Sequence, residues 1–582
     1  MATESTPEFA SSIIKHAKLA HDKQKTSKPD AFNGFDGFLR HLADPSGSAA
    51  LPVTVDTGHP ISHYFISSSH NTYLTGNQLW SKSSTEAYKD VLERGCRCIE
   101  IDVWDGDSPA HSSSSSEDEG EGHREVKKLT GLMKKGLGKF HSRKHSKEHA
   151  EAAPVSPAPD QTAMPAPWRA NSDRTEPRVL HGYTATKEVP FRKVCEVIRD
   201  YAFRKSDMPL IVSLEVHCSQ SQQDVMVEIM TEYWRQYLVP MPHDFSDETP
   251  LPTLESLRRR ILIKVKYSPP DKAAAEKAPA RSNTTAEPDS GDEESQVEPG
   301  KKGKICEALG KLGIYTRSCH FHSLDQAEAK IPTHVFALSE KKLMELQEEN
   351  REALFRHNLQ FLMRAYPKGT RVRSSNLDPA PLWRQGIQMV ALNWQEMNAA
   401  MMLNEAMFEG TGGWVLKPVD HCRLPVDESH QLPLVKRKRL DLSVTILAAQ
   451  HLDVDARTAP DVYVKCELHV ESKMEKEGEL PNQGETKDGE WKRCSLVHHS
   501  HDPDFASETL QFEDMRDVVP ELSFLRIKVM NDVSYQKDRM LGWTCFRLDR
   551  LPPGLRLLRL KGLDTTVNGG ALLVDTCLKF SE

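Results

Sequence analysis

The 582-residue sequence lacks the features that mark secreted and membrane-spanning proteins. It has no run of 18 apolar residues, so no transmembrane helix is expected. Residues 1–28 are polar and contain no apolar stretch of the kind that a secretory signal needs. The 11 cysteines are odd in number, and no CxxC pair occurs among them. This usage predicts reduced thiols in a cytoplasmic protein rather than a disulfide framework.

Net positive charge is also missing. The 76 Lys and Arg residues are outnumbered by 84 Asp and Glu residues, which gives a formal net charge of -8. Bulk charge therefore does not draw the chain to nucleic acid, and we expect no nucleic-acid partner; any attraction to an anionic membrane must be local. The length allows two to four domains, each able to bury a core.

Residues 1–50 form a short preface with signs of two helices. The first lies around 13–19 and the second around 35–39, before the Pro-Ser-Gly at 45–47. This segment is too short to form a core of its own. We expect it to pack against the domain that follows.

Residues 51–267 alternate between strand-like and helix-like segments. Strands are expected at 62–67, 97–104, 209–217 and 260–267, and helices at 84–93, 188–204 and 222–237. Ser83 or Ser84 can act as the N-cap of the first of these helices. Alternation of this kind is typical of a parallel sheet with helices outside it.

Two polar insertions interrupt this pattern. The first, 107–178, is Ser-rich and acidic, then basic, then Pro/Ala-rich, and the second, 268–311, is Ala/Pro-rich and then acidic. Neither can bury enough apolar surface to fold alone, so both are expected to be disordered. Within the first, 124–147 carries apolar residues at near-helical spacing among basic ones. It is either a basic amphipathic helix that binds anionic lipid or a solvated loop.

The alternation resumes at 312–425 and changes after 436. Strands are expected at 315–321, 387–392 and 413–416, and helices at 339–348, 351–364 and 399–408. About eight units in all predict one TIM-like (β/α)8 barrel, split by the second insertion. Residues 436–582 contain short alternating strands without a long helix, which predicts a separate β-sandwich.

Polar residues stand at or just after several predicted barrel strands. His70 and Asn71 follow the first strand, where they either cap a loop or face a ligand. Glu100 and Asp102 share one face of the next strand, roughly 6.6 Å apart along it. Glu215 is a further acid within an apolar strand, where it would be costly if unpaired.

The acids and the amide offer only oxygen ligands, which suits Ca²⁺ or Mg²⁺ better than zinc. A salt-bridged acid cluster is the alternative. His70 and His181 form a pair able to serve as acid, base or charge stabiliser. Lys264 and Lys266 share a face of their strand, as an anion clamp or as a strand end in solvent.

Longer motifs carry a family resemblance. Ser68-Ser-His-Asn-Thr-Tyr-Leu, Gly95-Cys-Arg-Cys-Ile-Glu-Ile-Asp-Val-Trp-Asp-Gly, His181-Gly-Tyr-Thr and Ser213-Leu-Glu-Val-His closely resemble the X region of eukaryotic phosphoinositide-specific phospholipase C. Ser374-Ser-Asn-Leu-Asp-Pro, Gly386-Ile-Gln-Met-Val-Ala-Leu-Asn-Trp-Gln and Gly413-Trp-Val-Leu-Lys-Pro resemble its Y region. The sandwich after them resembles the C2 domain of that family.

The resemblance implies an enzyme of intracellular signalling that acts at the membrane surface. It would hydrolyse phosphatidylinositol 4,5-bisphosphate to inositol trisphosphate and diacylglycerol, through a cyclic phosphodiester and with Ca²⁺. The implied Ca²⁺ ligands are Asn71, Glu100, Asp102 and Glu215. His70 would stabilise charge on the phosphoryl group, and His181 would act first as general acid and then as base. Glu100 or Glu215 would accept the proton of the attacking hydroxyl.

The resemblance also implies the head-group contacts. They are Lys264, Lys266, Ser339, Arg364 and Tyr366. Ser339 can equally be a plain helix cap, and both roles are compatible. An apolar ridge that enters the membrane would include Leu79, Tyr183 and Leu346.

The sequence departs from the family in two ways. We expect neither a pleckstrin-like domain nor two full EF-hand lobes before the barrel. In the C2 domain, Asp461 fits a first calcium loop, with Asp453 or Asp455 as helpers. In the third loop Asn531 and Val533 stand where paired acids are expected. A structural C2 domain is therefore the safer interpretation.

Two other functions compete with this one. A catalytically inactive phosphoinositide-binding scaffold of the same fold would have lost a histidine or an acid, and none is lost. A glycerophosphodiester phosphodiesterase would share the histidines and acids without needing the basic set or the C2 domain. Protein regulators are not indicated by the sequence.

Overall fold

The computed structural model describes residues 8–27, 32–106, 175–182, 188–267, 304–422, 435–454, 456–471, 490–533 and 536–582. The chain divides into two units, Met1–Asp105 with Pro177–Glu582, and Gly106–Glu176. Nearly all of the second unit lies outside the described residues, as do the predicted helix at 124–147 and most of the second insertion. The structure described below is that of the first unit.

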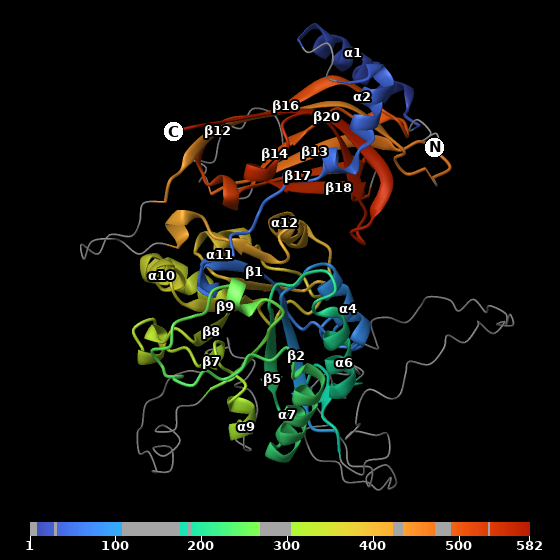
Figure 1. The fold of residues 1–582 in the computed structure, drawn as a ribbon. Helices are drawn as coiled ribbons and strands as arrows, with labels where there is room; N and C mark the ends of the chain where they lie inside the picture. Colours follow the sequence, from blue (N-terminus) through green and yellow to red (C-terminus); the bar gives the residue numbers. More distant parts are fainter. Residues whose placement is uncertain are drawn as a thin grey trace, which may run out of the picture. The chain divides into compact units, whose positions relative to one another are not determined.

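Eight parallel strands close into a barrel (Figure 1). In order around it they are β1 (Tyr64–Ser69), β2 (Cys98–Trp104), β5 (Leu210–Val216), β6 (Ile261–Lys266), β7 (Arg317–Cys319), β8 (His334–Ser339), β9 (Leu362–Tyr366) and β10 (Met389–Leu392). β10 pairs back onto β1 in parallel, which closes the ring. The TIM-like barrel is confirmed, with four strands from each side of the second insertion.

Shorter strands extend this barrel. The hairpin of β3 (Arg178–Val179) and β4 (Val189–Pro190) continues β2 with antiparallel pairing. β11 (Trp414–Leu416) runs antiparallel beside β1, so it is not a ninth barrel strand. α9 (Glu307–Gly310) buries Leu309 and lies at the end of the second predicted insertion.

The sequence missed β8 and β9. Residues 351–364 were expected to be helical, but α10 (Glu340–Asn358) ends earlier and Leu362 begins a strand. Leu, Met, Arg and Ala are all good helix formers, so local propensity favoured the wrong structure. Pairing on both sides, with β8 and β10, overrides that propensity. Arg364 consequently lies on a barrel strand.

The predicted outer helices are present and lie beside their strands (Figure 1). They are α4 (Thr85–Glu93), α6 (Phe191–Tyr201), α7 (Gln220–Trp234) and α12 (Ala399–Phe408). The short α11 (Ala380–Arg384) was not predicted. The Ser84 hydroxyl accepts a hydrogen bond from the Glu86 N–H at 3.1 Å, which is the predicted N-cap.

Apolar side chains fill the amino-terminal end of the barrel. Ile66, Ile211, Leu262, Leu362 and Met389, each from the first residues of a different strand, share one buried cluster. This apolar cluster holds the amino-terminal ends of the strands together. Polar side chains can then occupy the carboxyl-terminal ends, where TIM barrels carry their active sites.

The C-terminal part is the expected antiparallel sandwich (Figure 1). Its strands are β12 (Lys438–Gln450), β13 (Asp461–His469), β14 (Glu490–Cys494), β15 (His498–His499), β16 (Asp504–Val518), β17 (Phe524–Asn531), β18 (Arg539–Arg547), β19 (Gly554–Lys561) and β20 (Val567–Ser581). Alternate residues of these strands, among them Val464, Phe512 and Leu572, build a core separate from that of the barrel.

The N-terminal preface packs against the sandwich rather than against the barrel, so the sequence expectation was wrong. It consists of α1 (Ser11–Ser27), α2 (Gly34–Ala43) and α3 (Pro45–Ser48). Ile13 is buried in a cluster with Leu447 and Leu573. His16 Nε2 lies 2.8 Å from an Asp504 carboxylate oxygen. An apolar stripe shows that a helix needs a partner but does not identify the partner.

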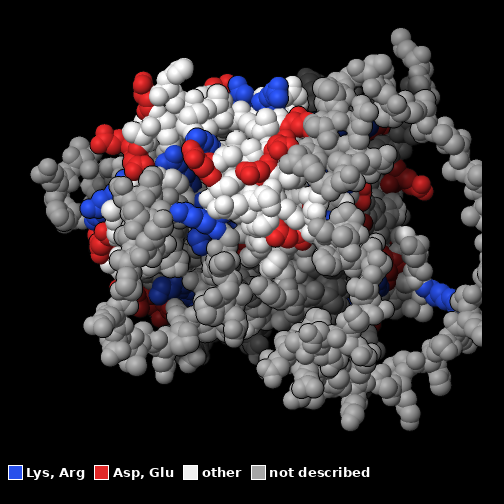
Figure 2. Space-filling view, turned by 90° about the horizontal axis from the view of Figure 1, so that it is seen from below, with Lys and Arg blue, Asp and Glu red and all other residues white. Residues whose placement is uncertain are grey.

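Two global expectations concern the cysteines and membrane-spanning helices. All eleven cysteines lie among the described residues and are free thiols. Among the described residues, no helix is long and apolar enough to cross a membrane. Figure 2 shows basic and acidic side chains interspersed over the described part of one face, around an uncharged area.

Candidate active site

Three carboxylates meet at the carboxyl ends of β2 and β5. Glu100 and Asp102 project from β2, and Glu215 pairs in register with Asp102 from β5. One oxygen from each lies within 4.8 Å of the others. Within the described ranges this is the one group of three or more acidic, His or Cys side chains close enough to hold a metal ion.

Asp102 is the least satisfied of the three. Its side chain accepts a hydrogen bond from the Tyr73 hydroxyl, while Oδ1 is buried without a hydrogen-bond partner in the described part of the chain. Burial, and then repulsion by Glu215 and Glu100, raises the pKa of Asp102 well above its usual value. A bound cation would relieve both costs, so these oxygen donors fit a hard divalent ion.

Glu100 is held differently. Arg364 from β9 lies 3.0 Å from its Oε2, and both side chains are buried. Burial alone would raise the pKa of Glu100, but Arg364, and after it His70, outweigh burial and hold that pKa below its usual value. Of the two predicted alternatives, the salt bridge is present at Glu100, while the three carboxylates together also have the spacing that a metal site needs.

The first turn after β1 places His70 and Asn71. Asn71 has a positive φ of 43°, a conformation that asparagine tolerates better than most residues. Its backbone N–H donates to Glu100 Oε2 at 2.8 Å, and its side-chain Nδ2 donates to Gln78 Oε1 at 2.8 Å. Asn71 thus lies against the carboxylate cluster, as a ligand role requires.

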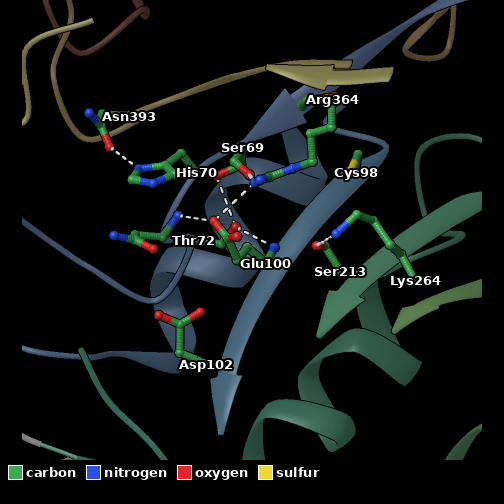
Figure 3. A network of polar contacts seen from close by, with 12 residues as sticks. Ser69, His70, Thr72, Cys98, Glu100, Asp102, Ser213, Lys264, Arg364 and Asn393 are labelled. Carbon is green, nitrogen blue, oxygen red and sulfur yellow. Dashed lines mark hydrogen bonds and ion pairs between the residues drawn. The ribbon is translucent and has the colours of Figure 1, made fainter. Parts of the chain in front are cut away.

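His70 is oriented by Asn393, which follows β10 (Figure 3). Its Nδ1 lies 3.0 Å from Asn393 Oδ1, and its ring stacks at 5° on that of Tyr366 with centroids 6.3 Å apart. Burial lowers the pKa of His70, while the Glu100 carboxylate acts in the opposite direction.

The second histidine, His181, follows β3. Its Nδ1 lies 2.8 Å from the backbone oxygen of Gln78, so Nδ1 carries a proton and donates it there. Gly182 lies against the Trp104 ring, where a Cβ atom would come within 1.9 Å of that ring. Trp104 also stacks on His217 at 4.0 Å, and His217 Nε2 lies 2.9 Å from Glu215. Trp104 therefore packs against both the His181–Gly182 segment and His217.

The predicted head-group residues differ in their burial. Lys264 is buried and donates to the Ser213 hydroxyl at 3.2 Å, whereas Lys266 is exposed at the strand end. Burial, and then the charge of Arg364, lowers the pKa of Lys264 to about 8. Ser339 accepts from the Lys342 N–H at 3.3 Å, so its helix-cap role is present.

Four residues of this network have no role that the sequence predicted. Tyr73, Gln78, His217 and Asn393 each hydrogen-bond or approach a predicted site residue. Asn393 could have been recognised, because it follows β10 as His70 follows β1. Gln78 lies in a loop, and its sequence neighbours give no sign that it is buried.

The C2 loops carry carboxylates that already have protein partners. Asp453 pairs with Arg539, Asp461 lies 2.8 Å from His499 Nδ1, and Asp538 accepts from the Tyr463 hydroxyl at 2.6 Å. Asp455 lies outside the described residues. These contacts engage acids that a calcium site would need, which favours the structural C2 domain that the sequence predicted.

The predicted apolar ridge is only partly supported. Leu346 is buried within α10, and Tyr183 lies outside the described residues. Leu79 is partly exposed, and its neighbour Trp80 has 59% of its surface exposed. The backbone N–H groups of both donate to Asn77 Oδ1, at 3.1 and 3.0 Å, which fixes this turn beside Gln78.

Comparison with known families matches three consecutive regions. The family described as "Phosphatidylinositol-specific phospholipase C, X domain" matches residues 57–267, and its Y domain matches residues 309–420. The C2 domain family matches residues 440–561. Together the X and Y regions account for more than half of the chain and include every predicted site residue.

Curated relatives carry matching names. "1-phosphatidylinositol 4,5-bisphosphate phosphodiesterase delta-4" of Pongo abelii is 30% identical over 574 residues, covering 93% of this chain and 64% of that protein. The human delta-1 protein is 29% identical over 586 residues, covering 95% and 65%. The chain thus spans just under two thirds of the length of these relatives.

Solved structures show the same fold. The crystal structure of L. pealei PLC21 is 25% identical with a TM-score of 0.66, covering 98% of this chain and 62% of that one. That of S. officinalis PLC21 is 24% identical with a TM-score of 0.68, covering 99% and 64%.

Proposed function

This chain belongs to the phosphatidylinositol-specific phospholipase C family, and from that membership we propose that it hydrolyses phosphatidylinositol 4,5-bisphosphate in a Ca²⁺-dependent reaction. The products would be inositol 1,4,5-trisphosphate and diacylglycerol. One observation carries the proposal: the Glu100, Asp102 and Glu215 cluster lies in the same hydrogen-bonded site as two histidines whose Nδ1 atoms both face carbonyl acceptors. That combination suits phosphodiester cleavage.

The histidines would divide the proton chemistry. His181 would donate a proton from Nε2 to the diacylglycerol oxygen as it leaves, and would then take one from water that opens the cyclic phosphodiester. His70 would act as an imidazolium beside the bound phosphate: its Nδ1–H would donate to Asn393 Oδ1, and its Nε2–H would donate a hydrogen bond to the phosphoryl oxygens, where negative charge grows. Ca²⁺ held by Asn71, Glu100, Asp102 and Glu215 would lower the pKa of the inositol 2-hydroxyl and offset phosphate charge.

The acceptor of the 2-hydroxyl proton is better assigned to Glu215 than to Glu100. Arg364 holds Glu100 at 3.0 Å and keeps its pKa below the usual value, which makes Glu100 a weak base. Glu215 is partly exposed and has His217 as its partner. A proton on Glu215 could therefore move on to His217 or to solvent.

Head-group recognition would use the basic residues around the carboxylates. Lys264 and Lys266 would meet the ring phosphates, Ser339 and Arg364 would add a hydroxyl and a guanidinium, and Tyr366 would pack on the inositol ring. Arg364 is paired with Glu100 in this structure, so a bound phosphate and the Glu100 carboxylate would have to share the Arg364 guanidinium.

The site would work at the membrane surface, reached transiently from the cytoplasm. Leu79 and Trp80 project from the turn that also carries Gln78. Tryptophan prefers the boundary between lipid and water, so this turn would enter the lipid interface beside the active site.

Release of water-soluble inositol phosphate from head-group-labelled lipid vesicles tests the proposal. We expect release with Ca²⁺ that stops in chelator, and losses of about 10²–10⁴-fold in H70A and H181A. Full activity in chelator, or in either variant, would refute the mechanism. Specific vesicle binding without any turnover would instead support the inactive scaffold.

A further inference from the structure

Gln78 forms hydrogen bonds with the candidate metal ligand Asn71, with His181, and with Asn393, the residue that orients His70. It lies in the loop between β1 and α4 and is 8% exposed. Its Oε1 accepts from Asn71 Nδ2 at 2.8 Å, and its Nε2 donates to Ser374 Oγ at 2.8 Å and to Asn393 Oδ1 at 3.2 Å. Its backbone oxygen faces His181 Nδ1 at 2.8 Å.

Ser374 determines which way the Gln78 amide points. The Ser374 hydroxyl donates its proton to the Gly76 backbone oxygen at 2.7 Å, so it can only accept from Gln78. Gln78 Nε2 therefore faces Ser374, and Oε1 faces Asn71. Because Asn71 must then donate its Nδ2 to Gln78, its carbonyl oxygen is the atom left to bind a cation.

The orientation of the Asn393 amide determines which nitrogen of His70 carries the proton. Asn393 Nδ2 donates to the Ser375 backbone oxygen at 3.2 Å, so its Oδ1 accepts from Gln78 Nε2 and from His70 Nδ1. With its proton on Nδ1, His70 presents Nε2 to the substrate. The Gln78 backbone oxygen likewise keeps a proton on His181 Nδ1.

We propose that Gln78 is the positioning residue of this site, orienting Asn71 and His70 through its side-chain amide and His181 through its backbone oxygen. The consequences for turnover rest on the proposed function, whereas the consequence for cation binding does not. Side-chain variants leave the backbone contact to His181 in place, so they isolate the amide.

Three variants of the full chain separate positioning from folding. Q78M has nearly the same shape and loses both hydrogen-bonding functions. Q78E can still accept from Asn71 but cannot donate to Asn393. Q395M is the matched control, because Gln395 Nε2 also donates to Ser374 Oγ, at 3.2 Å, and to the Gly76 oxygen, at 3.1 Å, without a hydrogen bond to Asn71 or Asn393.

Two measurements are needed: Ca²⁺ affinity by calorimetry, and kcat and KM on bisphosphate lipid. We expect Q78M to lose about 10–100-fold in both Ca²⁺ affinity and kcat, with KM little changed, since outer partners of metal ligands carry effects of that size. Q78E should keep wild-type or tighter Ca²⁺ affinity and lose kcat as Q78M does. Q395M should match wild type in both.

The proposal is overturned if Q78M keeps wild-type affinity and kcat, or if Q395M reproduces its losses, which would indicate a merely structural loop. If Q78M does not fold, Q78E tests the proposal: retained Ca²⁺ affinity with a reduced kcat supports it, and an unchanged kcat overturns it. In a further outcome, the wild type and all variants fail to hydrolyse lipid while Q78M alone weakens Ca²⁺ binding. The proposed function then fails, but the positioning of Asn71 by Gln78 stands.

Discussion

Arg364 on β9 and Glu100 on β2 form a buried ion pair, with 3.0 Å between the guanidinium and the carboxylate. The two residues come from opposite sides of the second insertion, 264 positions apart in the sequence. The pair keeps one of three neighbouring carboxylates ionised while Asp102 is driven toward protonation.

Replacing Arg364 by methionine should reverse the pH dependence that Glu100 contributes to stability. In the wild type the lowered pKa of Glu100 stabilises the fold above its unfolded pKa of about 4.3, and this is lost as the pH falls through the folded pKa. In R364M, burial would raise that pKa, so stability would be lost as the pH rises through it. We expect R364M to be about 3–5 kcal/mol less stable at pH 7, with a smaller deficit near pH 4–5.

Urea denaturation in chelator at the two pH values measures this effect. The double variant R364M/E100Q is the control, because it removes the unpaired charge and should recover much of the loss. A deficit in R364M that does not change with pH would contradict the assignment.

Calcium should bind in the barrel and not in the C2 loops. The barrel carboxylates have an unpartnered buried oxygen, whereas Asp461 is paired with His499. By calorimetry on the full chain, D102N should weaken Ca²⁺ binding by about tenfold or more, since even outer-shell changes reach that size. D461N should bind as wild type does; a second binding event that D461N abolishes would contradict this.

Lys264 should make recognition of phosphorylated head groups sensitive to alkaline pH. Its pKa is lowered to about 8, so the side chain is charged below that pH and neutral above it. We expect kcat/KM for bisphosphate lipid to fall as the pH rises through 8, with less change for phosphatidylinositol. K264M should remove the difference between the two lipids. Parallel pH profiles for both lipids in the wild type would exclude this role.

Trp80 should matter only when the substrate is in a membrane. W80A should raise KM several-fold on vesicles, because the exposed indole would lose its contact with the lipid interface. Activity on a short-chain monomeric lipid should stay unchanged. L563A is a matched control, because Leu563 is also 59% exposed but lies on the sandwich. Equal effects on both substrates would mean that Trp80 supports the active site instead.

The sequence by itself determined the strand-and-helix alternation and placed most of the candidate site residues on it. Segments such as 97–104 and 209–217 are short, β-branched and bounded by turns, so local patterning predicts them. His70, Asn71, Glu100 and Asp102 stand at or beside strand ends, where barrels collect their chemistry.

Tertiary structure alone decided the rest. Leu362–Tyr366 is a strand because β8 and β10 pair with it, against its own helical propensity. Ile13 lies against the sandwich through contacts more than 430 residues distant in sequence. Gln78 and Asn393 acquire their roles because hydrogen-bond donors and acceptors from separate loops must all be matched once buried. A linear sequence records the donors and acceptors of each residue, but only the closed barrel determines which of them meet.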